Sequence, residues 1–373
     1  MSLRQIVVQG FRNLTPQEIA IPEGVVAVVG DNGAGKTNLL EAVAVLGNLL
    51  SFRPGPPTSW VQRDGPGFTL AGVVSREGTE VELRQEARRA RSLIRALFRG
   101  SRRLGAAEYL GLCPVAVLSS HDRQLVWGPP EERRRFLDRI AFFLHPATLA
   151  VAQRYRRALR QRNALLGGGG HDEALDAFEH DLALLGARLV ELRGEALAIL
   201  ERLIDDELAA LGWGLSRPNL RYDSPEGFAP SDAATLATRM RAELTRRRRE
   251  DRARGHTSVG PHRHDLAISV AGAPAREVLS AGQGKLLATA CKLAAVTVVE
   301  RMRGRVPTVV FDDVDAELDA RVLERVLARL SGTGQVLISS AHEEMLLARV
   351  PAATVWRVRE GNVETPAGEG VRH

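Results

Sequence analysis

The segment Gly30-Asp31-Asn32-Gly33-Ala34-Gly35-Lys36-Thr37 has the G-x-x-x-x-G-K-[ST] spacing of a phosphate-binding loop. Its glycines let the backbone curl so that N–H groups point at phosphate oxygens, and a following helix N-terminus adds partial positive charge. In such a loop Lys36 reaches the β- and γ-phosphates, and the Thr37 hydroxyl is a ligand for Mg²⁺. The segment therefore predicts a nucleoside triphosphate site.

The flanking residues predict the elements that would position this loop. An apolar run at 25–29 indicates a buried strand, and leucines and Val43 recur at helical spacing across 38–50. The alternative is a chance glycine turn, which the strand–turn–helix context disfavours. The predicted nucleotide-binding residues are Gly30, Asp31, Asn32, Gly33, Ala34, Gly35, Lys36, Thr37 and Asn38.

A second apolar run, Thr308-Val309-Val310-Phe311-Asp312-Asp313, ends in two carboxylates and has the form of a Walker B segment. There Asp312 would hold Mg²⁺ through water, in line with Thr37. Asp313 stands where a catalytic base or water-orienting carboxylate is needed. A strand that ends in a helix-capping aspartate is the alternative, and the upstream phosphate loop weakens it.

The segment Leu279-Ser280-Ala281-Gly282-Gln283-Gly284-Lys285 opens a predicted helix at 286–299. A helix N-terminus with a serine hydroxyl is a second anion site. A chain with both features resembles the ABC-type ATPases, in which this second site closes over nucleotide held by a partner subunit. The resemblance implies that Ser280, Gly282 and Gln283 contact that nucleotide.

Two later features extend the resemblance. Asp315-Ala316-Glu317-Leu318-Asp319 looks like the D-loop of these ATPases. His342 follows a predicted strand at 336–340 and looks like the switch histidine that contacts the γ-phosphate, although alone it would be an ordinary exposed loop residue. The resemblance thus implies Lys36, Asp313 and His342 as catalytic residues.

The bulk composition bounds the class of protein. The chain has 373 residues, 44% of them hydrophobic, which leaves room for two or three domains. No uncharged apolar run approaches the ~20 residues that span a bilayer, and the first residues lack a secretion signal. Cys113 and Cys291 have no metal-binding spacing. We expect a cytoplasmic protein that does not associate with membranes.

Basic residues outnumber acidic ones by 51 to 45, and all except Lys36, Lys285 and Lys292 are arginines. Genome composition could produce this bias. The arginines gather in four clusters, at 88–103, 133–135, 154–162 and 246–254. Such clusters suit a polyanion, because each neutralised phosphate releases counterions, but they could equally be solvated helix faces paired with acids. An aromatic content of 5% favours contact with duplex backbone over base stacking.

The pattern of strands and helices predicts the domain organisation. Strands are expected at 4–8, 18–21, 25–29, 68–74, 81–86 and 115–118, and helices at 146–166, 171–211 and 231–254. The first two of these helices, separated by Gly167–Gly170, form a short antiparallel hairpin. We predict an α/β ABC-type ATPase head with a P-loop, built from residues 1–129 and 256–373, and an inserted helical arm domain at 130–255.

Among the ABC-type ATPases the chain resembles the RecF family, bacterial DNA-repair ATPases of the SMC-like group, over nearly its whole length. Phe11-Arg12-Asn13 matches the family's F-R-N, residues 128–138 its G-x-P-x-x-R-R-x-F-L-D, and residues 260–266 its G-P-H-R-x-D-L. Two segments depart from the family. Ser119-Ser120-His121-Asp122 replaces Ser-Pro-Glu-Asp, and residues 281–284 are less Gln-rich.

The resemblance implies a protein that binds ATP with Mg²⁺, forms a head-to-tail homodimer around two nucleotides and binds duplex, gapped or junction DNA. It further implies action with RecR and RecO to help RecA load in recombinational repair, with slow hydrolysis that releases the dimer. Gln124 is the candidate Q-loop residue at the metal. Arg12 and Asn13 either contact nucleotide or support the N-terminal hairpin. The alternatives are a transporter nucleotide-binding subunit and a scaffold with a vestigial nucleotide site.

Overall fold

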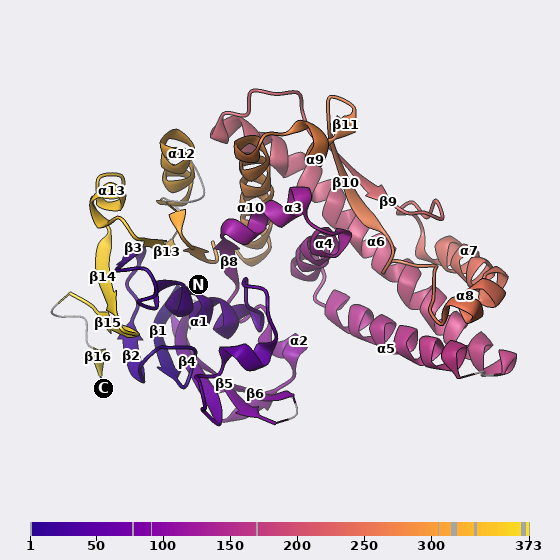
Figure 1. The fold of residues 1–373 in the computed structure, drawn as a ribbon, viewed down its shortest axis with the longest axis horizontal. Coiled ribbons are helices and arrows are strands. Elements are labelled where there is room, and N and C mark those ends of the chain that lie inside the picture. Colours follow the sequence, from indigo (N-terminus) through magenta and orange to yellow (C-terminus); the bar gives the residue numbers. More distant parts are fainter. Residues whose placement is uncertain are drawn as a thin grey trace. The chain divides into compact units, whose positions relative to one another are not determined.

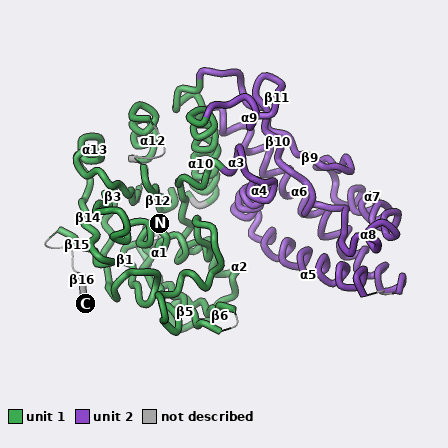
Figure 2. Tube along the Cα trace, in the orientation of Figure 1, with its two compact units in different colours: residues 1–123, 207–213, 281–373 green, residues 124–206, 214–280 purple. Residues whose placement is uncertain are grey.

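The computed structural model describes residues 2–76, 78–90, 92–168, 171–304, 306–314, 319–331, 334–366 and 371–372. The chain divides into two compact units, coloured separately in Figure 2. Unit 1 contains residues 1–123, 207–213 and 281–373, and unit 2 contains residues 124–206 and 214–280. Most of unit 1 therefore comes from the two ends of the chain.

A six-stranded sheet forms one layer of unit 1, in the order β15-β14-β3-β13-β12-β8 (Figure 1). The neighbouring strands from β14 to β8 pair in parallel, and β15 pairs antiparallel at the edge. Strands β12 and β13 are buried along their whole length, as parallel strands covered on both faces are. The bounds are β3 (Gly24–Val29), β8 (Val115–Leu118), β12 (Thr308–Phe311), β13 (Gln335–Ser340), β14 (Thr354–Arg359) and β15 (Asn362–Glu364).

A seven-stranded antiparallel sheet forms a second layer, in the order β16-β2-β1-β4-β5-β6-β7. Strands β6 and β7 are absent from the predicted set because arginines interrupt their apolar alternation. The bounds are β1 (Ser2–Gln9), β2 (Gln17–Ala20), β4 (Gly67–Arg76), β5 (Thr79–Arg89), β6 (Leu93–Arg99), β7 (Arg102–Leu104) and β16 (Val371–Arg372).

Helix α1 (Lys36–Asn48) contacts strands of both sheets, and its residues from Leu39 to Asn48 are all buried. A helix that is apolar on all sides is stable only inside a core, so the layers on both sides hold α1 and the loop before it. The described residues of unit 1 also form the helical segments η1 (Pro57–Trp60), α2 (Ala106–Tyr109), η2 (Ser120–Arg123), α10 (Ala281–Arg303), α12 (Ala320–Ser331) and α13 (Glu343–Leu347).

Unit 2 is mainly helical (Figure 1). The predicted helix at 231–254 is two helices, because the chain breaks at Arg247. The helices are α3 (Gln124–Trp127), α4 (Pro130–Leu144), α5 (Thr148–Gly167), α6 (Asp172–Leu211), α7 (Ala233–Arg246), α8 (Arg248–Arg254) and α9 (Ala275–Val278).

A small sheet in unit 2 explains why this unit extends beyond the predicted insertion at 130–255. Strand β10 (Asp265–Val270) pairs antiparallel with β9 (Asn219–Asp223) and with β11 (Ala273–Pro274). This pairing ties residues that follow 255 to the helical unit. The last turn of α6 instead belongs to unit 1, where buried Glu207 accepts hydrogen bonds from Thr297 (3.0 Å) and Arg329 (3.2 Å).

A fully buried arginine holds the helices of unit 2 together. The Arg162 guanidinium of α5 donates to Glu179 Oε1 of α6 at 2.9 Å and to Asp251 Oδ2 of α8 at 2.7 Å. It also donates to the Thr257 hydroxyl at 2.9 Å. Two buried carboxylates thus surround one buried cation. Their ion pairs and hydrogen bonds offset the cost of removing these charges from water.

Candidate nucleotide site

The predicted phosphate loop connects β3 to the N-terminus of α1. Gly30 and Gly35 have φ values of 147° and 121°, and a Cβ at Gly30 would lie 2.3 Å from the Val358 carbonyl oxygen. Only glycine fits this approach. Gly35 is the N-cap of α1 and offers no side-chain cap. The N–H groups of the first turn therefore remain available for an anion.

Lys36 lies over the loop that precedes it. Its Nζ donates to the carbonyl oxygens of Gly30 at 2.6 Å and Asp31 at 3.0 Å. Asp31, Asn32 and Gly33 are exposed, whereas Gly35 is buried. The ammonium group is thus held beside the anion-binding turn.

Hydrogen bonds connect this loop to the end of β12. The Thr37 hydroxyl donates to Asp312 Oδ1 at 2.9 Å. The Ser339 hydroxyl of β13 donates to the same oxygen at 2.8 Å and accepts from the Asp313 N–H at 2.8 Å. Phe311 of β12 pairs with Ile338 of β13 in parallel register. The next residue of each chain segment, Asp312 and Ser339, therefore lies beside the other. Ser339 is not among the predicted residues, and a lone hydroxyl at the end of an apolar strand is the signal that could have found it.

Asp312 is a suitable partner for a cation. It is 8% exposed, and this burial raises the pKa of its carboxyl above the usual value, against the lowering effect of the Ser339 and Thr37 hydrogen bonds. A hydroxyl and a carboxylate are the hard oxygen donors that Mg²⁺ takes, usually with substrate phosphates and water. Consistently, the described residues contain no cluster of three or more His, Cys, Asp or Glu that could hold a metal by itself. Thr37 and Asp312 therefore fit Mg²⁺, which when bound neutralises charge on the phosphate oxygens.

Asp313 and His342 follow neighbouring strands and are both exposed. Asp313 has a φ of 53°, a left-handed conformation that is uncommon outside glycine, although Asp and Asn adopt it more readily than other residues. His342 is the N-cap of α13, and its backbone N–H donates to the Ser340 hydroxyl at 2.8 Å. Both side chains thus lie at the C-terminal edge of the parallel sheet, where ligands of α/β folds bind.

The N-terminal hairpin packs on α1 beside the phosphate loop. Arg12 donates to both oxygens of fully buried Glu41, at 2.7 and 2.9 Å, which favours the supporting role for Arg12 over nucleotide contact. Asn13 donates to the Gly33 carbonyl oxygen at 3.3 Å and accepts from Asn38 at 2.6 Å. Glu41 is not among the predicted residues, because the sequence around an acidic residue in an apolar helix does not reveal that Arg12 is its partner.

The predicted signature residues lie at the start of α10. Ser280 and Gly282 are exposed, and Gln283 is partly buried. The predicted D-loop lies outside the described residues, except Asp319. Gln124, the candidate Q-loop residue, is the first residue of α3 in unit 2. A Cβ on Gly128 would lie 2.4 Å from Gln124 Oε1, so this amide is folded against Gly128.

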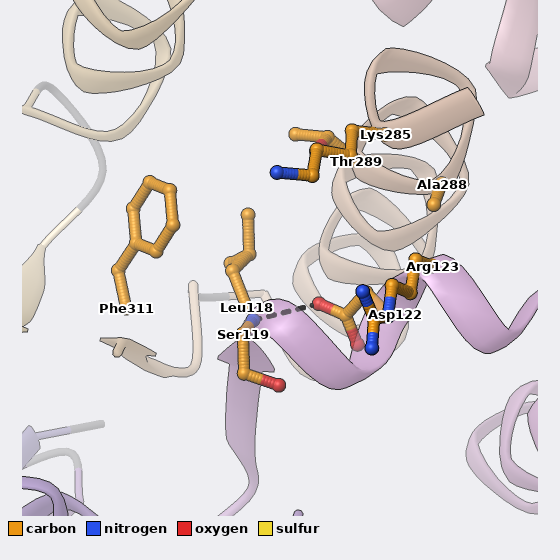
Figure 3. A pocket seen from close by; sticks show the side chains of 8 residues that line it. All are labelled: Leu118, Ser119, Asp122, Arg123, Lys285, Ala288, Thr289 and Phe311. Atoms are coloured by element: carbon orange, nitrogen blue, oxygen red, sulfur yellow. Dashed lines mark hydrogen bonds between the residues drawn. The ribbon is translucent and has the colours of Figure 1, made fainter. Parts of the chain in front are cut away.

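A small cavity lies beyond the end of β8 (Figure 3). Its volume of about 10 Å³ is close to the minimum for one water molecule. The buried Ser119 hydroxyl lines it and has no hydrogen-bond partner among the described residues. The Ser119 N–H donates to Asp122 at 2.8 Å, and Asp122 pairs with Lys292 at 2.9 Å. The departure from the family motif at 119–122 thus forms an ordered turn.

Comparison with known proteins identifies the family of this chain. Residues 2–363 match the model of the RecF/RecN/SMC N terminal domain. The chain is 33% identical to the DNA replication and repair protein RecF of Synechococcus sp. (strain JA-3-3Ab), over 97% of each chain. It is also 33% identical to RecF of Myxococcus xanthus (strain DK1622), over 95% of each chain. The chain belongs to the RecF family.

Solved structures extend the comparison. The recombination mediator protein RecF, solved with ATP, is similar with a TM-score of 0.88 and 26% identity over 98% of this chain and 99% of that one. An Smc head bound to the C-winged helix domain of ScpA shares the fold, with a TM-score of 0.54 and 16% identity. The predicted fold class, an SMC-like α/β ATPase head, is therefore confirmed.

Membership in the RecF family, whose members belong with the SMC-type ATPases, favours repair over the transporter alternative. In the described part of the chain, no helix is long and apolar enough to span a bilayer. The roles of the individual site residues stay predictions.

Proposed function

We propose that this RecF-family chain is a DNA-binding repair ATPase whose homodimer closes on ATP. The observation that carries this proposal is the chain of hydrogen bonds from Thr37 through Asp312 to Ser339 and Asp313. These hydrogen bonds support the proposal, because the candidate metal ligands and the candidate base lie next to an uncapped helix N-terminus, and phosphoryl transfer needs such a set of groups.

Each predicted residue then has a physical task. Lys36 exchanges two loop carbonyls for the β- and γ-phosphates of ATP, and Thr37 with Asp312 holds Mg²⁺. Asp313 orients the attacking water, and His342 contacts the γ-phosphate. These groups act mainly by position and charge, because phosphoryl transfer requires little covalent help from the protein.

Dimerisation follows from the exposed start of α10. Ser280, Gly282 and Gln283 of one copy meet the γ-phosphate held by Lys36 of another, so ATP completes the interface. Hydrolysis removes the group that both copies share, and slow turnover would thus time release from DNA. The similar RecF solved with ATP is a recombination mediator in the RecFOR pathway. This supports RecR and RecO as partners here. The family resemblance further implies loading of RecA at gapped or junction DNA, in the cytoplasm.

Sedimentation with ATP, with ADP and with a slowly hydrolysed analogue tests the proposal. We expect dimers with ATP and the analogue but not with ADP. Ser280→Arg should abolish these dimers while leaving ATP binding intact, because a large cation replaces the hydroxyl at the predicted interface. Met302→Arg adds the same charge to a side chain 48% exposed near the far end of α10 and is the matched control. A protein that stays monomeric in saturating Mg·ATP, or a Ser280→Arg variant that dimerises normally, would contradict the proposal.

A further inference from the structure

Several arginines in two of the four clusters are paired within the protein. In the cluster at 246–254, Arg246 and Arg247 pair with Glu243, and Arg254 pairs with Glu250. Arg133 is 7% exposed and binds Asp265 through two 2.8 Å hydrogen bonds. These arginines are neutralised by the protein itself, and they have little charge left to offer a polyanion.

Helix α5 differs from these two clusters, because it carries five arginines and no acidic residue. Arg154, Arg157 and Arg160 are exposed and have no ion pair with any described carboxylate. Arg156, which is also exposed, lies 4.0 Å from Asp138, a carboxylate already bound by Arg193 at 2.7 Å. The fifth, Arg162, is the buried residue that anchors the helix.

The inner face of α5 is held rigidly, so the outer arginines are displayed from a fixed support. Besides Arg162, buried Tyr155 hydrogen-bonds His262 Nδ1 at 2.7 Å. His262 belongs to the G-P-H-R-x-D-L motif, and the next residue, Arg263, is exposed and has no ion pair with any described carboxylate. The loop that contacts α5 through His262 therefore also carries the exposed cation of Arg263.

The chemistry of the outer face indicates its partner. The exposed residues among the arginines are Gln153 and Gln161, with no large apolar side chain. Protein–protein interfaces rely on buried apolar and aromatic anchors, which this face lacks. Arginine and glutamine both donate to phosphate oxygens. Arg154 and Arg160 lie about 9 Å apart along the axis at 1.5 Å per residue, a span that covers several duplex phosphates.

We propose that the outer face of α5, formed by Arg154, Arg156, Arg157 and Arg160, binds the phosphodiester backbone of duplex DNA. The proposal rests on the proposed DNA-binding function and assigns its surface. We expect this contact to be made to phosphates and not to base edges, because it consists of cations spaced along one helix face. Binding through α5 is therefore independent of sequence and strongly dependent on salt.

The test measures DNA affinity against salt concentration for the full-length protein with a short blunt duplex and the slowly hydrolysed ATP analogue. The variant carries Arg154→Gln, Arg157→Gln and Arg160→Gln, which preserves helix propensity. The control carries Arg246→Gln, Arg247→Gln and Arg254→Gln, which removes the same charge from the neutralised cluster of the same unit. A plot of log K against log salt concentration has a negative slope. We expect this slope to become less negative by about 3 in the α5 variant, or about 0.9 for each lost phosphate contact. In the control it should change by less than about 1.

The outcomes separate this proposal from the proposed function. Wild-type protein that dimerises with ATP but binds no duplex would overturn both DNA binding and the α5 assignment. An α5 variant with the wild-type slope, or with the same change as the control, would overturn the assignment alone. A variant that binds duplex normally but loses ATP-dependent dimers would show that the face contacts a second copy instead.

Discussion

The Thr37 hydroxyl donates a 2.9 Å hydrogen bond to Asp312, a residue 275 positions later in the chain. Ser339 binds the same carboxylate from the neighbouring strand. The candidate site therefore exists only after β3, β12 and β13 have assembled in parallel, and its activity is coupled to the folding of unit 1.

Ser339→Ala should lower kcat for ATP hydrolysis by about 10- to 100-fold with little change in KM. The hydroxyl holds both the Asp312 carboxylate and the Asp313 backbone, and losing a hydrogen bond to a charged group costs about 1.5–3 kcal/mol. Steady-state hydrolysis checks this, and Ser339→Thr, which retains a hydroxyl, should recover much of the rate. Equal kcat values for the Ala variant and the wild type would exclude Ser339 as a positioning residue.

Asp313→Asn should slow hydrolysis by about 100-fold or more, because it removes the carboxylate proposed to orient and activate the attacking water, and should prolong ATP-bound dimers on DNA. Asparagine tolerates the left-handed φ of 53° found here, so the backbone should be preserved. Single-turnover hydrolysis and DNA dissociation rates measure both effects. An unchanged single-turnover rate would remove Asp313 from the catalytic set.

Arg162→Gln should destabilise unit 2 by about 3–5 kcal/mol, because it removes the buried counter-charge of Asp251 and leaves buried Glu179 with Arg248 as its cationic partner. Arg160→Gln, two residues away on the exposed face, should change stability by less than about 0.5 kcal/mol. Urea unfolding of the two variants provides the comparison. Similar midpoints would mean that the Arg162 cluster contributes little net stability.

Acid should destabilise unit 2 through His262, whose pKa is lowered to about 4, mainly by burial. Its Nε2 must donate to the Thr257 carbonyl oxygen, so Nδ1 accepts from Tyr155 in the neutral ring. Between about pH 4 and the unfolded value near 6.5, the unfolded chain binds more protons. Stability therefore rises with pH there, by at most about 1.4 kcal/mol per unit.

Urea unfolding at several pH values measures this dependence. His262→Gln should flatten it, although buried His264, whose pKa is also lowered, contributes in the same direction. His256→Gln changes an exposed histidine bound only to a backbone carbonyl and is the control. A His262→Gln variant with the wild-type slope would show that His262 does not titrate in this window.

Residues close in sequence determined the motifs of this protein. The phosphate loop, the Walker B carboxylates and the start of α10 are each defined by a strand or helix boundary and a short run of side chains. Long apolar periodicity likewise predicts α1, α5 and α6, because a helix that buries one face repeats its apolar residues at a fixed spacing. These features need no information about distant partners.

Only the tertiary structure decided which charges are already neutralised and which are not. Arg12 meets Glu41, Arg133 meets Asp265 and Arg162 meets two acids, while Arg154, Arg157 and Arg160 meet no described carboxylate. In the sequence all of these are similar arginines. Their difference arises because an ion pair depends on distance in space, and folding brings together residues such as Arg133 and Asp265, which lie 132 positions apart in the chain.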